Sequence, residues 1–202
     1  KGDFTVYKRS DLQAVSDNEL NKPYDLLKKV SNWRRFYAVI NAASVFMEKA
    51  PRTVELDRSY SEQNLKYDIA QVRALRAFAY FYMVRIWGDV PLVTYSYDNG
   101  TFPSMPRTDA QTVLSYAKAE LLTAIKDLPY QYGTQTNLYY GSYGAQWQGK
   151  LFNKLSAYSV LAHICAWQGN YAEAETYSAF IIDHASEINA KYTSIADLTS
   201  ET

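Results

Sequence analysis

Cysteine, histidine and the common catalytic motifs are scarce or absent in this sequence. Its 202 residues include one cysteine, Cys165, so the chain has no disulfide framework of its own. The two histidines, His163 and His184, lie in different predicted helices and belong to no metal-ligand motif. No phosphate-binding or dinucleotide-binding glycine motif is present, and YGSYG (residues 140–144) does not match the G-x-S-x-G nucleophile elbow. We therefore predict that the protein is not an enzyme and uses no metal or cofactor.

Net charge and long uninterrupted hydrophobic runs are missing as well. The chain has 21 basic and 21 acidic residues, so nothing in its charge favours nucleic acid as a partner. Its most apolar stretch, residues 69–87, contains Arg73, Arg76 and Arg85, and arginines near the centre of a span are costly in a bilayer. We therefore predict that this stretch is a helix of the protein core rather than a membrane span.

Aromatic residues, by contrast, are abundant. They make up 15% of the chain, and 19 of them are tyrosine. A hydrophobic fraction of 48% is too high for a disordered chain, so a packed core is expected. Tyrosine has an apolar ring and a polar hydroxyl. It is therefore suited both to a hydrophobic core and to a solvent-exposed contact with a sugar or a peptide. Cys165 lies on an apolar predicted helix and is expected to be a small core residue.

Apolar residues recur every three or four positions along most of the chain, which predicts an all-α fold. The expected helices span residues 24–49, 60–87, 108–128, 153–168 and 171–185. Pro51 and Pro129 are expected to stop the first and third helices, and Gly88 is expected to cap the second in a left-handed conformation. No strand pattern is sustained, and VPLVTY (residues 90–95) is the best short candidate.

The last two predicted helices show the residue order of a tetratricopeptide repeat. Tyr158 is followed by the pair Leu161-Ala162, then by Gly169 at a turn, Tyr171 and Ala174. Small residues let two antiparallel helices approach closely, and glycine accepts the tight connection. We expect one domain over residues 1–202, built of tetratricopeptide-like antiparallel helix pairs with long aromatic loops. Its clearest repeat lies at residues 153–187.

Two groups of residues are candidates for special roles. Arg73 and Arg76 are expected to be buried and to pair with carboxylates or helix-end carbonyls, because an unpaired buried guanidinium is costly; Asp89 and Asp68 are candidates. The second group lies in the loop rich in tyrosine, glycine and glutamine. This loop is either an ordinary loop anchored by its rings or a flat aromatic platform on which sugar rings stack. Its ring-bearing residues are Tyr139, Tyr140, Tyr143 and Trp147.

The segment IAQVRALRAFAYFYMVRIWGDVPLV (residues 69–93) resembles the signature helix of the SusD/RagB family of Bacteroidetes. Three further segments match the family in the same order, at residues 32–46, 106–129 and 169–183, so the resemblance extends from Trp33 to Asp183. It implies a structural role for the signature residues in a helical scaffold. These residues are Arg73, Arg76, Trp87, Gly88, Asp89 and Pro91.

The resemblance also implies a function. It points to a non-catalytic, nutrient-binding lipoprotein on the extracellular face of the outer membrane, which passes oligosaccharides to a TonB-dependent, SusC-like transporter. Peptide binding by the same scaffold is an alternative, and an intracellular helical-repeat adaptor is an alternative from another class. Contact with the membrane would occur only through a lipid anchor that this chain does not contain.

This chain departs from the family pattern in two ways. Members of the family are considerably longer, with a lipidated N-terminal cysteine and a large irregular C-terminal half, so the chain is expected to be an N-terminal fragment. In the family, part of the ligand surface comes from the segment that precedes the tryptophan-containing helix, which is residues 5–18 here. The resemblance thus makes Tyr7 and Asn18 further ligand-binding candidates.

Overall fold

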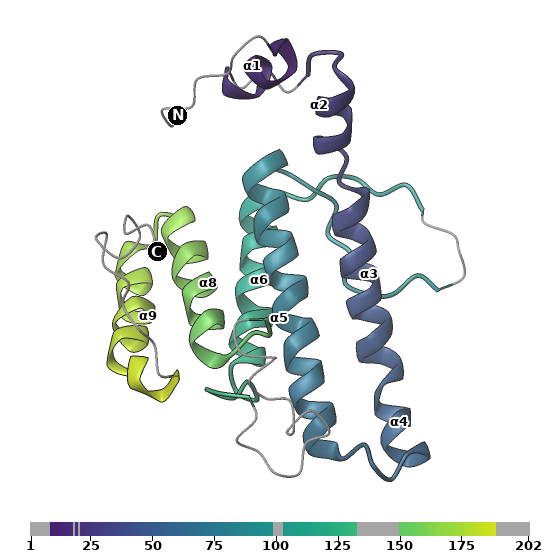
Figure 1. Ribbon diagram of the computed structural model, residues 1–202, viewed down its shortest axis with the longest axis vertical. Coiled ribbons are helices and arrows are strands. Elements are labelled where there is room, and N and C mark those ends of the chain that lie inside the picture. The colour runs from purple at the N-terminus through teal and green to yellow at the C-terminus, as the bar shows by residue number, and fades with distance from the viewer. Residues whose placement is uncertain (1–8, 18, 20, 99–102, 133–149, 189–202) are drawn as a thin grey trace, which may run out of the picture.

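The computed structural model describes residues 9–17, 19, 21–98, 103–132 and 150–188, and in these ranges the chain is all-α (Figure 1). The VPLVTY segment contributes only an isolated antiparallel bridge, between Val90 and Thr108. The all-α prediction is therefore confirmed. The helices are α1 (Ser10–Ser16), α2 (Asp25–Val30), α3 (Arg34–Lys49), α4 (Pro51–Leu56), α5 (Glu62–Trp87), α6 (Ala110–Ala124), α8 (Lys154–Trp167), α9 (Tyr171–Asp183) and the 3-10 helix η2 (Ala185–Ile188).

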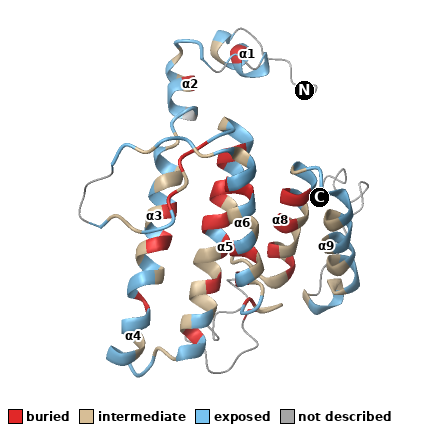
Figure 2. Ribbon diagram, turned by 180° about the vertical axis from the view of Figure 1, so that it is seen from behind, coloured by how far each residue is buried: buried red, intermediate tan, exposed pale blue. Residues whose placement is uncertain are grey.

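The helices form a row with α5 and α6 at its centre. Figure 1 shows α3 and α4 on one side of this central pair and α8 and α9 on the other, while α1 and α2 lie at the end where α3 begins. Helix α5 makes its most extensive contacts with α6 and α3. Helix α8 makes its most extensive contacts with α9 and α6. Buried residues concentrate on α5, α6 and α8, whereas α4 and α9 have none (Figure 2).

Small side chains explain the central position of α5. Ala70, Ala74 and Ala77 follow one face of this helix and are at most 2% exposed, so α6 can approach it closely. The prediction that residues 69–87 form a core helix is confirmed. The helix is not buried on all sides, however, because Leu75 and Tyr82 remain 42% and 38% exposed. Among the helices in the described ranges, none has both the length and the apolar character needed to cross a bilayer.

The predicted first helix is interrupted. Instead of one helix over residues 24–49, the chain forms α2 and α3, separated at Ser31–Trp33. The Asn32 side chain accepts a hydrogen bond from the Arg34 backbone N–H at 2.9 Å and so satisfies a free donor at the start of α3. Helix α3 ends at Lys49, as expected from Pro51. Pro51 then opens α4, because a proline at the first position of a helix lacks only an N–H that has no partner there.

The third predicted helix is shorter than expected. Helix α6 begins after Asp109, whose side chain caps the helix by accepting a hydrogen bond from the Thr112 N–H. It ends at Ala124 rather than near Leu128, and tighter turns continue the chain. Leu128 is nevertheless only 1% exposed, so the apolar pattern correctly predicted its burial but not its helical conformation.

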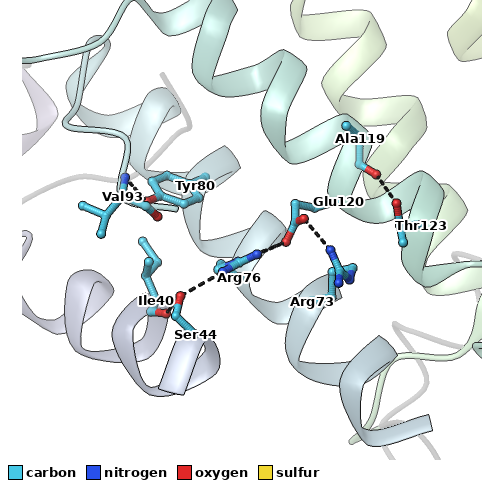
Figure 3. A network of polar contacts seen from close by, with 9 residues as sticks. All are labelled: Ile40, Ser44, Arg73, Arg76, Tyr80, Val93, Ala119, Glu120 and Thr123. Carbon is cyan, nitrogen blue, oxygen red and sulfur yellow. Dashed lines mark hydrogen bonds and ion pairs between the residues drawn. The ribbon is translucent and has the colours of Figure 1, made fainter. Parts of the chain in front are cut away.

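A polar cluster holds α3, α5 and α6 together inside the bundle (Figure 3). Arg73 Nη1 lies 2.7 Å from Glu120 Oε1, and Arg76 donates through Nε and Nη2 to Glu120 Oε2. Arg76 Nη1 also donates to Ser44 Oγ on α3 at 2.8 Å. The prediction that the arginines have a structural role agrees with this geometry.

The predicted partners of the arginines, Asp89 and Asp68, were wrong. Both belong to other interactions: Asp89 accepts from the Ala110 N–H, and Asp68 accepts from the Tyr60 hydroxyl. Glu120 takes their place because it stands on the face of α6 that packs against α5.

Helices α8 and α9 form the predicted tetratricopeptide-like pair, with a tight turn at Gly169 and Asn170. Gly169 has φ +80°, and its N–H donates to the Ala166 carbonyl, while the Asn170 N–H donates to the Cys165 carbonyl at 2.8 Å. These two bonds form a Schellman motif, which uses a left-handed residue to end a helix. The Asn170 side chain then caps α9. Cys165 is fully buried, as its apolar surroundings predicted.

The turn gives a direct stability prediction. Gly169→Ala is expected to lower the free energy of unfolding by about 1–2 kcal/mol, because a Cβ disfavours the left-handed backbone conformation. No atom lies within 4 Å of a Cβ built at this position, so the cost is conformational rather than steric. Urea denaturation followed by circular dichroism measures it. Gln168→Ala is the control and should change stability by less than about 0.5 kcal/mol; an equal loss in both variants would contradict the explanation.

Candidate functional site

A groove of about 550 Å³ lies between the first half of α3 and the chain that follows α5. Helix α3 and the residues just before it form one wall, and two proline-containing segments form the other. We call this surface the aromatic groove. Its lining residues are Asn32, Trp33, Arg34, Tyr37, Ala38, Asn41, Pro91, Tyr97, Pro103 and Met105.

Side chains of α3 hold the facing segment in place. The Tyr37 hydroxyl donates a hydrogen bond to the Pro91 carbonyl at 2.6 Å. One turn further along, the Asn41 amide donates to the Tyr97 carbonyl at 2.8 Å and accepts from the Tyr97 N–H at 2.7 Å. An amide side chain thus satisfies both backbone groups of one residue, which orders a segment that has no regular secondary structure.

Tyr80 fixes the same segment from the side of α5. Its hydroxyl donates to the Val93 carbonyl and accepts from the Val93 N–H, both at 2.8 Å (Figure 3). Tyr80 is fully buried, and burial raises its pKa above the usual value for tyrosine. Burial raises the pKa of Tyr37 in the same way. Both phenols therefore stay protonated, and remain hydrogen-bond donors, well into the alkaline range.

Trp33 forms the aromatic end of the groove. Its ring meets Tyr37 edge-on at a centroid distance of 5.9 Å and Trp87 at 6.1 Å. The guanidinium of Arg107 lies 5.2 Å from the centre of the Trp33 ring and donates to the Asp89 carbonyl at 3.3 Å. The groove is therefore built from rings that already pack against one another.

The residues of the signature motif build this end of the molecule. Gly88 ends α5 with φ +69°, so the predicted positive φ is confirmed, although its ψ of −119° lies outside the left-handed helical region. The Asp89 carboxylate accepts from the Ala110 N–H at 3.0 Å and fixes the start of α6. Trp87 packs edge-on against Phe36 at 5.5 Å, and Pro91 lines the groove. The motif thus connects α5, α6 and the groove wall.

The ligand-binding residues predicted from the sequence lie outside the described residues. This applies to the aromatic loop with Tyr139, Tyr140, Tyr143 and Trp147, and also to Tyr7 and Asn18. The groove was not predicted from the sequence, although Tyr95 and Tyr97 form a second pair of closely spaced aromatic residues, in the loop after α5. Their rings lie 5.0 Å apart, and the Tyr97 hydroxyl donates to the Tyr95 hydroxyl at 2.6 Å.

A second cleft, of about 790 Å³, lies between α3, α4 and the start of α5. Its carboxylates are engaged locally: Asp57 accepts from the Ser59 hydroxyl at 2.6 Å, and Asp68 accepts from the Tyr60 hydroxyl at 2.8 Å. In the described ranges, no group of histidine, cysteine and acidic side chains could hold a metal ion. The smaller aromatic groove is the better candidate, because rings beside amide and guanidinium groups are typical of ligand sites.

The fold and the groove define a class: an all-α, tetratricopeptide-like protein with an aromatic surface groove. No protein-family model matches the chain. A SusD-like protein of Formosa agariphila, P38, is 30% identical over 169 residues, which cover 82% of this chain and 28% of that protein. Among solved structures, a SusD superfamily protein of Bacteroides vulgatus has a TM-score of 0.69 at 17% identity, covering 95% of this chain and 36% of that one.

A laminarin-binding SusD-like protein has a TM-score of 0.56 at 27% identity, covering 72% of this chain and 28% of that one. The chain belongs to the SusD/RagB family. It spans under a third of the length of the curated relatives that it matches.

Proposed function

We propose that the protein is a non-catalytic, oligosaccharide-binding component of a nutrient-uptake system on the extracellular face of the outer membrane. In this proposal, residues 1–202 form one helical unit of a lipid-anchored protein that works with a TonB-dependent, SusC-like transporter. Family membership supports this role, and a relative that is 27% identical is a laminarin-binding protein. The observation that carries the proposal is the aromatic groove, whose rings and amides match the apolar faces and hydroxyl groups of a sugar.

The groove is expected to bind through its rings. Tyr97→Ala should weaken binding of laminarin oligosaccharides at least about tenfold, because a ring at the centre of a contact surface often contributes more than 1 kcal/mol to binding. The wall itself should remain, since Asn41 holds the backbone of Tyr97 rather than its ring. Isothermal titration calorimetry against a panel of soluble glycans and short peptides measures the effect.

Tyr171→Ala is the matched control, because Tyr171 is 73% exposed at the start of α9 and removal of its ring leaves the groove intact. If Tyr97→Ala binds glycans as well as the control does, the groove is not the site. Binding of peptides in place of glycans would favour the peptide-binding alternative. If neither glycans nor peptides bind, the proposal is wrong and the helical-repeat adaptor becomes the favoured alternative. The rings of Tyr139, Tyr140, Tyr143 and Trp147 stay in the proposal as additional ligand contacts.

A further inference from the structure

The charge of the aromatic groove is one-sided. None of the described residues that line it is acidic, and Arg34 contributes a guanidinium at the start of α3. A second guanidinium, from Arg107, lies 5.2 Å from the centre of the Trp33 ring, and its positive charge also acts on the Tyr37 hydroxyl. Two cations therefore flank the rings.

In the part of the chain that the structure describes, the carboxylates on the neighbouring elements form no ion pair with Arg34 or Arg107 and have other hydrogen-bond partners. Asp89 accepts from the Ala110 N–H, and Asp98 is paired with Lys49 at 2.7 Å. Glu48 accepts from the Ser96 N–H at 3.0 Å and from its hydroxyl at 2.6 Å.

The two arginines themselves are open to a ligand. Among the described residues, Arg34 is exposed and has no ion-pair partner, and the hydrogen bond of Arg107 goes to a carbonyl rather than to an acid. Within the described ranges, neither guanidinium group is therefore held by a carboxylate.

We propose that the aromatic groove selects anionic oligosaccharides, which carry carboxylate or sulfate groups, over neutral ones. This inference rests on the proposed function, because it names the ligand class of the same groove. The planar fork of arginine donates two parallel hydrogen bonds to a carboxylate or sulfate group. The rings of Trp33 and Tyr97 would contact the sugar faces while Arg34 binds the acidic group. An exposed cation attracts anions less strongly as salt screens it, so the selection should weaken at high ionic strength.

Two matched pairs of probes test this selection. The first compares tetragalacturonate with its methyl ester, which has the same backbone without charge. The second compares a sulfated laminarin oligosaccharide with its unsulfated parent. In each pair the anionic member should bind at least about tenfold more tightly at low salt, and the ratio should fall as salt is added. Comparison of the two pairs shows whether carboxylate or sulfate is the preferred group.

Variants of Arg34 show whether the groove is responsible. Arg34→Gln should clearly lower the ratio between anionic and neutral probes, because it removes both the charge and the guanidinium fork, while Arg107 remains. Arg34→Lys keeps the charge without the fork, so an intermediate ratio is expected. Arg52→Gln is the control, since Arg52 is an exposed arginine on α4, away from the groove lining.

The outcomes separate the inference from the proposed function. If both members of each pair bind equally, or if Arg34→Gln keeps the full ratio, the inference is wrong and the oligosaccharide function stands. If no member of either pair binds, and the neutral glycans of the wider panel also fail, the proposed function itself is wrong and the inference falls with it.

Discussion

Glu120→Ala is expected to lower the free energy of unfolding by about 3–5 kcal/mol, which is the usual cost of removing one partner from a buried ion pair. Glu120 accepts hydrogen bonds from both Arg73 and Arg76, and the Arg76 side chain is only 6% exposed. Without the carboxylate, Arg76 would keep its bond to Ser44 but would remain a charge inside the bundle. Denaturation with urea, monitored by the loss of helical circular dichroism, measures the change.

Two further variants sharpen this test. Glu175→Ala removes an exposed acid on α9 and should change stability by less than about 0.5 kcal/mol. Glu120→Gln keeps an acceptor of similar shape without the charge. Its loss of stability should therefore lie between those of Glu120→Ala and Glu175→Ala. A Glu120→Ala protein as stable as the Glu175→Ala protein would show that the ion pairs are dispensable for stability.

Tyr80→Phe should give the second-largest decrease in the free energy of unfolding. Phenylalanine removes the hydroxyl that serves both backbone groups of Val93, a residue only 1% exposed. Each buried group left without a partner costs about 1–3 kcal/mol. The same variant should weaken glycan binding, since Val93 lies between Pro91 and Tyr97 in the segment that forms the groove wall. Urea denaturation and titration calorimetry measure the two effects.

Tyr171→Phe provides the control, because it removes a hydroxyl from a tyrosine that is 73% exposed. Equal stability of the two variants would contradict the role given to the Tyr80 hydroxyl. A loss of stability with unchanged glycan binding would mean that Tyr80 supports the core alone and that the groove wall is held by Tyr37 and Asn41.

Helices with strong local end signals were predicted well from the sequence. Residues 60–87 were expected to be helical, and α5 spans Glu62–Trp87. The last pair was expected at residues 153–168 and 171–185 and is found at Lys154–Trp167 and Tyr171–Asp183. Asn153, Gly169 and Asn170 mark these ends with caps that depend only on neighbouring residues.

The break between α2 and α3 was missed because apolar periodicity continues across it. Leu27, Val30, Trp33 and Tyr37 recur every three or four positions, even though the backbone at residues 31–33 is not helical. The available signal was Ser31-Asn32, since serine and asparagine within a helical pattern compete for backbone hydrogen bonds. Asn32 does this by accepting from the Arg34 N–H.

Long-range pairs were the least predictable feature. Glu120 could have been noticed, because it interrupts the apolar face that Ala117, Leu121 and Ala124 form on α6. The groove gave no comparable local pattern. Its wall depends on the bonds between Asn41 and Tyr97, which are 56 positions apart, and only the packing of α3 beside α5 brings them together.

The position of Glu120 between two arginines has a geometric consequence for the groove. Apolar contacts between α5 and α6 are not directional, so a slide of one helical turn, about 5.4 Å, would preserve many of them. The same slide would pull the carboxylate away from at least one guanidinium, and Ser44 places a similar condition on α3. These polar bonds therefore set how far along α5 its neighbours stand. Because Trp33 precedes α3 and Pro91 follows α5, the same buried bonds set the relative position of the two groove walls along the helix axis.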